Sequence, residues 1–195
     1  MNLERKKITV IGPSGVGKTT LIFRMCYDAF EENIKPTIGA SFSEKEIRGI
    51  NEQDYVLQFW DTAGMERYAT IVPAYYPRTY IFWMVFDLSD KDSLRKLQLI
   101  SITLFQRVTE TPRIYLIGNK KDICDSITWK SDVEQFMTTL PYVEYFEVSA
   151  KSGQNLKLIE YQLQKDCCTI IIPRSICIEI ASDSGKGSEN SKKCC

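Results

Sequence analysis

A glycine-rich stretch near the start of the chain has the residue types and spacing of a phosphate-binding loop. It reads Gly-Pro-Ser-Gly-Val-Gly-Lys-Thr over 12–19, fits G-x-x-x-x-G-K-[ST], and lies between a strand pattern and a helical pattern. Glycines let the backbone curl so that successive N–H groups point at one anion, and the next helix adds its positive dipole end. Lys18 would reach the terminal phosphates and the Thr19 hydroxyl would coordinate Mg²⁺. The predicted triphosphate contacts are Ser14, Gly15, Val16, Gly17, Lys18, Thr19 and Thr20.

This loop does not choose the base, and an ATPase or a small-metabolite kinase fits it as well as a GTPase does. The sequence Asn-Lys-Lys-Asp at 119–122 narrows the choice. A carboxylate at Asp122 can accept hydrogen bonds from the N1–H and exocyclic amine of guanine, and a buried Asp would reject adenine, which offers no such donor pair. The stem of Lys120 can lie against the base.

Two more loops follow strand patterns. Ser-Ala-Lys at 149–151 offers a backbone N–H to the guanine O6, and Asp-Thr-Ala-Gly lies at 61–64. Each stretch alone is as typical of a turn or a helix cap, but four such loops in this order predict a guanine-nucleotide site. The predicted base contacts are Asn119, Lys120, Asp122, Ser149, Ala150 and Lys151.

The elements that would position these loops alternate along the chain. Strand patterns occupy residues 8–11, 42–50, 54–60, 80–86, 113–118 and 142–148, and helical patterns occupy 17–26, 91–108, 131–140 and 154–165. Alternation of this kind predicts an α/β domain with a mostly parallel sheet covered on both faces. Ligands bind beyond the carboxyl ends of the strands in such sheets, which is where the four loops lie.

Composition limits the function further. The 195 residues carry 25 basic and 25 acidic side chains, so a nucleic-acid binder, which normally has a basic excess, is not expected. The chain has no histidine, which excludes triads and metal sites that depend on it. Seven cysteines in no disulfide pattern, with no apolar leader at the N-terminus, predict free thiols in the cytosol.

With these motifs in place, the chain resembles a small GTPase of the Rab family, within the Ras superfamily, over about residues 5–166 and again at the last two cysteines. The stretches that carry this resemblance are Ile-Gly-Ala-Ser-Phe at 38–42, Leu-Gln-Phe-Trp at 57–60, Arg-Tyr-Ala-Thr-Ile at 67–71 and Tyr-Tyr at 75–76. The resemblance implies a P-loop NTPase fold whose six-stranded sheet has one antiparallel edge strand. It also implies GTP or GDP with Mg²⁺ as ligands.

The resemblance assigns roles to further residues. Thr37 would give its hydroxyl to Mg²⁺ and its backbone N–H to the γ-phosphate, Asp61 would hold Mg²⁺ through water, and Gly64 would meet the γ-phosphate. Phe30 would pack across the guanine, although a core phenylalanine is an equally good interpretation. The implied effector surface is Ile38, Phe42, Trp60 and Tyr75, whose aromatic members would otherwise be assigned to the core.

The sequence departs from the family at Met65. The Asp-x-x-Gly loop normally continues with a glutamine that orients the attacking water, and a thioether has no amide to do so. Together with Lys18, Thr37 and Gly64, this position makes up the catalytic set. Phosphoryl transfer depends on positioning, so we expect slow intrinsic hydrolysis and retained nucleotide binding. The activating proteins of this family supply an arginine and a glutamine in trans, which would preserve assisted turnover.

The C-terminal end resembles the Rab signal for two geranylgeranyl groups at Cys194 and Cys195. Two lipids are needed because one gives only marginal membrane residence. The predicted organisation is a GTPase domain over 1–168, an apolar segment of unassigned role over 169–180 and a flexible prenylated tail over 181–195.

The family implies a monomer that regulates vesicle trafficking on the cytoplasmic face of an intracellular membrane and cycles through the cytosol. Its implied partners are exchange factors, GTPase-activating proteins, a dissociation inhibitor or escort protein, and effectors. The alternative is a pseudo-GTPase that holds GTP as a membrane-tethered scaffold, and a P-loop metabolic kinase is disfavoured by residues 119–122.

Overall fold

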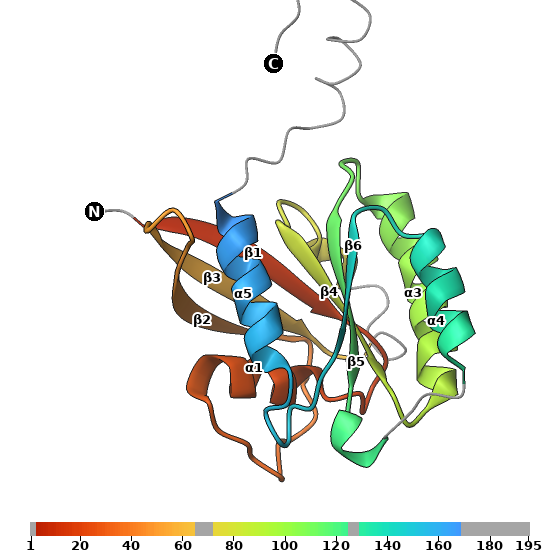
Figure 1. Ribbon diagram of the computed structural model, residues 1–195. Helices are drawn as coiled ribbons and strands as arrows, with labels where there is room; N and C mark the ends of the chain where they lie inside the picture. Colours follow the sequence, from red (N-terminus) through yellow and green to blue (C-terminus); the bar gives the residue numbers. More distant parts are fainter. Residues whose placement is uncertain (1–2, 65–71, 125–128, 169–195) are drawn as a thin grey trace, which may run out of the picture.

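The computed structural model describes residues 3–64, 72–124 and 129–168, which form one sheet flanked by helices (Figure 1). The six strands lie in the order β2-β3-β1-β4-β5-β6, and every neighbouring pair is parallel except β2 with β3. This confirms the predicted mostly parallel sheet with one antiparallel edge strand. The strands are β1 (Glu4–Ile11), β2 (Ala40–Arg48), β3 (Asp54–Thr62), β4 (Ile81–Asp87), β5 (Arg113–Asn119) and β6 (Val143–Glu147).

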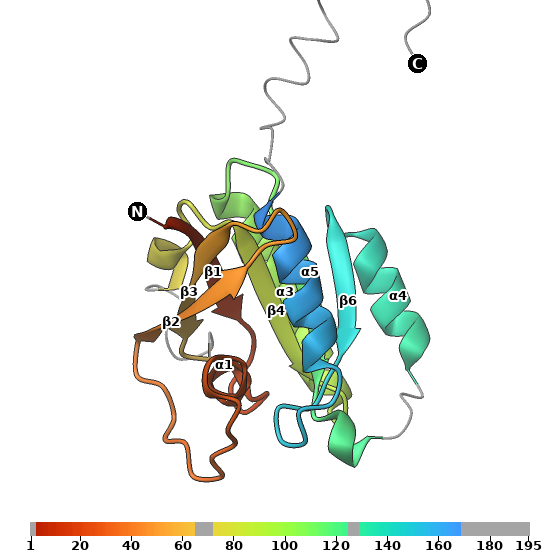
Figure 2. The ribbon, with the colours of Figure 1, turned by 60° about the vertical axis from the view of Figure 1, so that its left-hand side comes forward.

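Helices cover both faces of the sheet. In Figures 1 and 2, α1 and α5 lie on one face, and α3 and α4 lie on the other. Asp90 caps α3, because its side chain accepts a hydrogen bond from the backbone N–H of Asp92. The helices are α1 (Lys18–Tyr27), α3 (Lys91–Arg107), α4 (Lys130–Thr138) and α5 (Leu156–Cys167), with short 3₁₀ turns η1 (Val72–Tyr75) and η2 (Lys121–Ile123).

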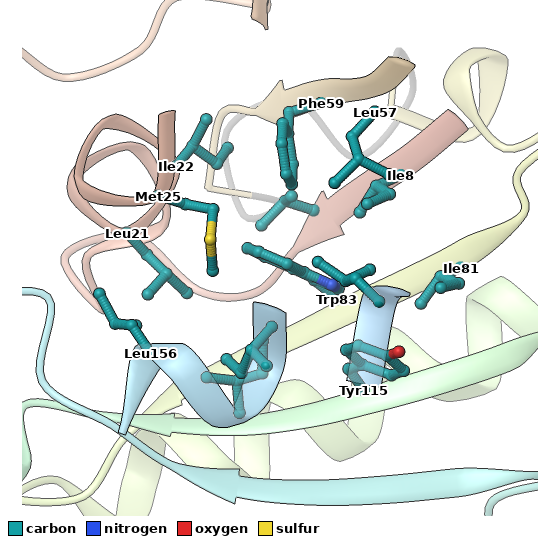
Figure 3. Close-up of a cluster of buried hydrophobic side chains, with 14 of the residues drawn as sticks. Ile8, Leu21, Ile22, Met25, Leu57, Phe59, Ile81, Trp83, Tyr115 and Leu156 are labelled. Atoms are coloured by element: carbon teal, nitrogen blue, oxygen red, sulfur yellow. The ribbon is translucent and has the colours of Figure 1, made fainter. Parts of the chain in front are cut away.

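The core consists of two clusters separated by the sheet. Side chains of α1 and α5 pack on one face around Trp83, whose ring centroid lies 5.1 Å from that of Phe59 (Figure 3). Side chains of α3 and α4 pack on the other face around Phe82 and Phe86. All seven residues of β4 are buried, as expected for a parallel strand covered on both faces. Continuous apolar runs were therefore a reliable sequence signal for β4.

The strand β1 begins four residues earlier than the sequence pattern predicts. Its first four residues, Glu-Arg-Lys-Lys at 4–7, pair in parallel with residues 55–58 of β3. These four residues are all charged, so the sequence shows no apolar pattern there. They belong to the strand because their backbone pairs with β3.

The strands of the sheet begin and end at two opposite sides of the domain. We call the side where the carboxyl ends of the parallel strands lie, and where α1 begins, the carboxyl edge; this term does not refer to the edge strands. At the opposite edge, which we call the amino edge, β1, β4 and β5 begin and α5 ends (Figure 1). Among the helices of the described residues, none has the length and apolarity needed to span a bilayer.

Candidate nucleotide-binding site

The predicted phosphate loop lies at the carboxyl edge, between β1 and α1. Gly17 has φ 90°, and a Cβ atom there would lie 2.5 Å from Nδ2 of Asn119. A Cβ on Gly64 would lie 2.7 Å from Cβ of Ser14, so the end of β3 approaches the loop closely. Only glycine fits these two close approaches. The sequence-predicted Gly17 and Gly64 are thus brought to one place.

Lys18 is 6% exposed and curls back over the loop that precedes it. Its Nζ donates to the carbonyl oxygens of Gly12 at 2.9 Å and Pro13 at 2.7 Å. These bonds hold the ammonium over the mouth of the loop, where an anion would find it already oriented.

A cluster of hydroxyl and carboxylate oxygens lies beside this ammonium. Thr19 Oγ1 donates to Oδ2 of Asp61 at 2.6 Å, and Thr37 Oγ1 donates to the same atom at 3.0 Å. The two hydroxyl oxygens are 2.8 Å apart. The three residues predicted to hold Mg²⁺ therefore converge from α1, from the segment before β2, and from β3.

The other carboxylate oxygen of Asp61, Oδ1, is buried without a hydrogen-bond partner among the described residues. Burial raises the pKa of this carboxyl above its ordinary value, although the hydrogen bond from Thr19 and the charge of Lys18 act in the opposite direction. A hard cation is what such an oxygen set lacks, because Mg²⁺ prefers carboxylate, hydroxyl and water oxygens. The donor set and the unpaired oxygen fit Mg²⁺.

A pocket of about 290 Å³ opens at this point. It is bounded by the phosphate loop, by the segment 34–38 and by the end of β3 at 62–64. The sequence analysis gave no role to its lining residues Ile34, Lys35 and Pro36, because no motif includes them, nor to Thr62 and Ala63, the two middle residues of the 61–64 motif.

Asn119 joins three loops of the site. Its Nδ2 donates to the carbonyl oxygen of Val16 at 2.9 Å, and its Oδ1 accepts from the backbone N–H of Ala150 at 3.0 Å. At 2% exposure, this side chain is fully occupied with holding the phosphate loop and the 149–151 loop together. These bonds give Asn119 a positioning role, and its expected contact with the base stays a prediction.

The carboxylate of Asp122 accepts a hydrogen bond from the Ser149 hydroxyl at 2.5 Å. This bond orients the carboxylate. The sequence analysis expected a buried Asp122, and the structure corrects this, because the residue is exposed at the rim of the carboxyl edge.

Lys120 has φ 65°, and its Nζ forms an ion pair with Oδ2 of Asp87 at 2.7 Å. Burial raises the pKa of Asp87, but Lys120 and Ser89 outweigh it and hold that pKa below its ordinary value. Asp87 is the last residue of β4, and Lys120 follows the neighbouring strand β5. The sequence position of Asp87 gave no sign that it holds this lysine in place.

In the adjacent loop, the backbone N–H of Ser149 bonds to Gln154 O at 3.2 Å, and those of Ser152 and Gly153 bond to Ser149 at 3.0 and 2.9 Å. The backbone N–H of Ala150 donates to Asn119. The backbone N–H of Lys151, in contrast, has no acceptor among the described residues.

The remaining predicted contacts lie at the surface. Phe30 is 37% exposed, which rules out the core interpretation. Phe42 and Trp60 pair across β2 and β3 with ring centroids 5.2 Å apart, and Trp60 lies 5.5 Å from Tyr75. Phe42 is 48% exposed and the neighbouring Ile38 is 84% exposed, so the three aromatic rings form one partly exposed row. Met65, Cys194 and Cys195 lie outside the described residues.

The fold and this constellation define a P-loop nucleotide-binding protein of the small GTPase class. A model of the Ras family matches residues 7–169. The chain is 34% identical over 163 residues to "Ras-related protein Rab-3" of Caenorhabditis elegans, covering 83% of this chain and 74% of the relative. It is 35% identical over 158 residues to "GTP-binding protein YPT53" of Saccharomyces cerevisiae, covering 77% and 70%. It is 36% identical over 151 residues to human "Ras-related protein Rab-3A", covering 77% and 68%.

The chain therefore belongs to the Ras family and is a Rab-like small GTPase. Membership of this family implies binding of guanine nucleotide and Mg²⁺.

Proposed function

We propose that this chain binds GTP and GDP with Mg²⁺ and works as a membrane-anchored switch in vesicle trafficking. The observation that carries the proposal is the meeting of Thr19, Thr37 and Asp61 within 3.0 Å of one another beside the Lys18 ammonium. Three separate segments of the chain deliver these groups, and a triphosphate with its cation is the ligand that satisfies all of them.

Each residue has a distinct task when nucleotide binds. Lys18, which now donates to two carbonyl oxygens, would donate to phosphate oxygens instead. Thr19 and Thr37 would hold Mg²⁺ through their hydroxyl oxygens, and Asp61 would hold it through water. When bound, the cation would neutralise charge that develops on the phosphates.

Base selection rests on the orientation of Asp122 by Ser149. An oriented carboxylate accepts the two donors of guanine and would be left unpaired by adenine. The N–H of Lys151 is the donor that the 149–153 loop leaves for the guanine O6. Competition of unlabelled GTP and ATP against a fluorescent GDP tests this assignment, and equal competition would contradict it.

The switch couples Thr37 to the end of β3. The backbone N–H of Ala63 donates to the carbonyl oxygen of Gly39 at 2.9 Å, and Ala40 pairs with Thr62 in the antiparallel ladder. A γ-phosphate that draws in Thr37 and Gly64 acts on both ends of this connection. Loss of that phosphate releases them, which changes the surface around the row of Phe42, Trp60 and Tyr75. We propose that effectors read this row and Ile38.

Hydrolysis should be slow without help, because Met65 has no amide to orient water. We expect Met65→Gln to accelerate single-turnover hydrolysis of GTP while GDP affinity stays unchanged. Equal rates in the two proteins would contradict this explanation. A wild-type rate indistinguishable from the background would instead favour the alternative function, a GTP-holding scaffold.

Membrane anchoring is proposed to occur through geranylgeranyl groups on Cys194 and Cys195. Exchange factors, activating proteins and a dissociation inhibitor or escort protein are the corresponding partners. We expect the double variant Cys194→Ser, Cys195→Ser to leave the membrane fraction in cells while retaining nucleotide. A double variant that stays on membranes would refute lipid anchoring at these positions.

A further inference from the structure

A second pocket lies at the amino edge, far from the nucleotide loops. It has a volume of about 910 Å³, and we call it the amino-edge basin. The start of β1, the segment from η1 to β4, and the connection between α3 and β5 form its walls. In Figure 1 these segments lie at the top of the molecule, whereas the phosphate loop lies at the bottom. The nucleotide-binding role of the carboxyl edge does not explain it.

The lining of the amino-edge basin is strongly basic, although the chain as a whole has zero formal charge. Two carboxylates, Glu4 and Glu110, face six cationic side chains there. The six are Arg5, Lys6, Lys7, Arg78, Arg107 and Arg113.

Three of these cations have a carboxylate partner within the protein. Lys6 forms an ion pair with Glu4 at 2.7 Å, Arg5 lies 3.8 Å from Glu44, and Arg113 pairs with the buried Asp166. These three pairs therefore contribute little to the binding of an external anion.

The other three cations produce the excess charge. Lys7 donates to the carbonyl oxygen of Pro77 at 2.9 Å and lies over the Trp60 ring at 5.1 Å, but has no carboxylate partner among the described residues. Burial lowers the pKa of Lys7, which a nearby anion would oppose. Arg78 and Arg107 are exposed, and no described residue forms an ion pair with either. Three cations against the single carboxylate of Glu110 thus remain for a ligand.

The amino-edge basin adjoins the last turn of α5. The Tyr80 hydroxyl, on the wall of the basin, donates to the carbonyl oxygen of Asp166, one residue before the helix ends at Cys167. The chain that leads to the proposed lipid anchor therefore leaves the domain beside the basin. The amino edge is therefore the side of the domain from which the chain continues toward the proposed anchor.

We propose that the amino-edge basin binds the phosphorylated headgroup of an anionic phospholipid through Lys7, Arg78 and Arg107. One guanidinium group can donate two parallel hydrogen bonds to two oxygens of a phosphate, whereas a lysine ammonium acts as a point charge. The volume of the basin is within the range of small-molecule sites, and clustered Lys and Arg side chains near a membrane surface attract anionic lipid headgroups. This inference deepens the proposed function, because it gives the anchored domain a preferred lipid and a preferred orientation.

The test uses the full, unlipidated chain loaded with GDP, so that binding does not depend on geranylgeranyl groups. Partitioning is measured onto phosphatidylcholine vesicles that contain phosphatidylinositol bisphosphate, and onto phosphatidylserine vesicles matched in surface charge. The variant is Arg78→Gln, Arg107→Gln. Its matched control is Lys96→Gln, Lys157→Gln, which removes the same charge near the starts of α3 and α5, away from the basin. Both lysines are exposed, and no described residue forms an ion pair with either.

We expect the wild type to prefer the bisphosphate vesicles, and the double variant to lose roughly 30-fold in partitioning onto them. The control variant should partition like the wild type. Equal binding to both vesicle types, or an equal loss in the control, would overturn the proposal, because diffuse charge would then explain the binding. Tight binding of soluble inositol trisphosphate without vesicle binding would also overturn it, since the ligand would not be a lipid.

Bound GDP is measured in each sample. A chain that holds no nucleotide refutes the proposed function, whereas a chain that holds GDP but ignores the vesicles refutes only the role of the amino-edge basin.

Discussion

Two buried carboxylates, Asp166 at the amino edge and Asp61 at the carboxyl edge, differ in the partners that the protein provides for their charge. Asp166, near the end of α5, is 3% exposed and contacts the Arg113 guanidinium, the Tyr115 hydroxyl at 2.6 Å and the Gln162 amide at 3.1 Å. Asp61, at the end of β3, is 2% exposed, has only hydroxyl donors on one oxygen, and has none on the other among the described residues.

The difference separates a structural carboxylate from a ligand-binding one. A buried charge is tolerated when its counter-charge and hydrogen bonds are built into the protein, as they are around Asp166. Asp61 instead carries a desolvation cost that an ion from solution can remove. Buried polar groups without partners occur mainly at sites where a ligand supplies the missing partner. Asp61, at the carboxyl edge, is such a group.

The largest expected effect comes from Asp166→Ala, which should lower the free energy of unfolding by about 3 kcal/mol. Removing one member of a buried pair leaves the other without a partner, although 24% exposure of the Arg113 side chain lets water limit the loss. Urea denaturation of the GDP-bound protein measures this.

Asp132→Ala is the matched control, because Asp132 pairs with Lys91 at 2.7 Å with both side chains more than a third exposed. It should cost about 0.5 kcal/mol. Equal losses in the two variants would mean that the contacts of Asp166 add no stability beyond those of a surface pair.

The second effect concerns Asp61→Asn. Burial raises the pKa of Asp61, so its ionised form is less favourable in the folded chain than in the unfolded chain at neutral pH. We therefore expect the thermal stability of the protein without Mg²⁺ to stay the same or to rise.

The same substitution should weaken Mg²⁺-dependent retention of GDP about 10- to 100-fold, as for other residues that hold a metal through an intermediate group. Titration of Mg²⁺ against the release rate of a fluorescent GDP measures this. A drop in stability with unchanged Mg²⁺ dependence would place Asp61 with Asp166 as a structural carboxylate.

The smallest effect is alkaline sensitivity at the amino edge. Burial raises the pKa of the Tyr76 hydroxyl from its ordinary value of 10.0 to about 12. The unfolded chain therefore releases this proton first as pH rises, and stability falls between pH 10 and 12. Tyr76→Phe should reduce that fall by about 1 kcal/mol, measured by denaturation at several pH values. The exposed Tyr161→Phe serves as control, and a shift of equal size there would refute the assignment.

The sequence was sufficient for the sheet and for the order of the loops along its carboxyl edge. The apolar run of β4 and the glycine pattern of the phosphate loop are both local in sequence. They can therefore be recognised without any knowledge of tertiary contacts. The meeting of Thr37 with Thr19 and Asp61 was implied by the family resemblance and not by spacing, because Thr19 and Asp61 lie 18 and 24 residues from Thr37 in sequence.

The roles that the sequence did not reveal depend on contacts between distant segments. Asn119 bonds to a carbonyl group 103 residues away, and no local pattern encodes such a bond. Asp87 and Asp166 look like ordinary charged residues near the ends of a strand and a helix, and only their partners Lys120 and Arg113 show what they do. The exposure of Asp122 is of the same kind, since burial depends on how far neighbouring loops extend over it.

The start of β1 and the end of α5 at the same edge make the domain a spacer of fixed length. With eight residues at about 3.3 Å each, β1 separates the two edges by roughly 26 Å. A protein immobilised on a surface through either of these ends would have its nucleotide pocket on the side of the domain away from the attachment. Nucleotide exchange measured on such a surface should therefore match exchange in solution.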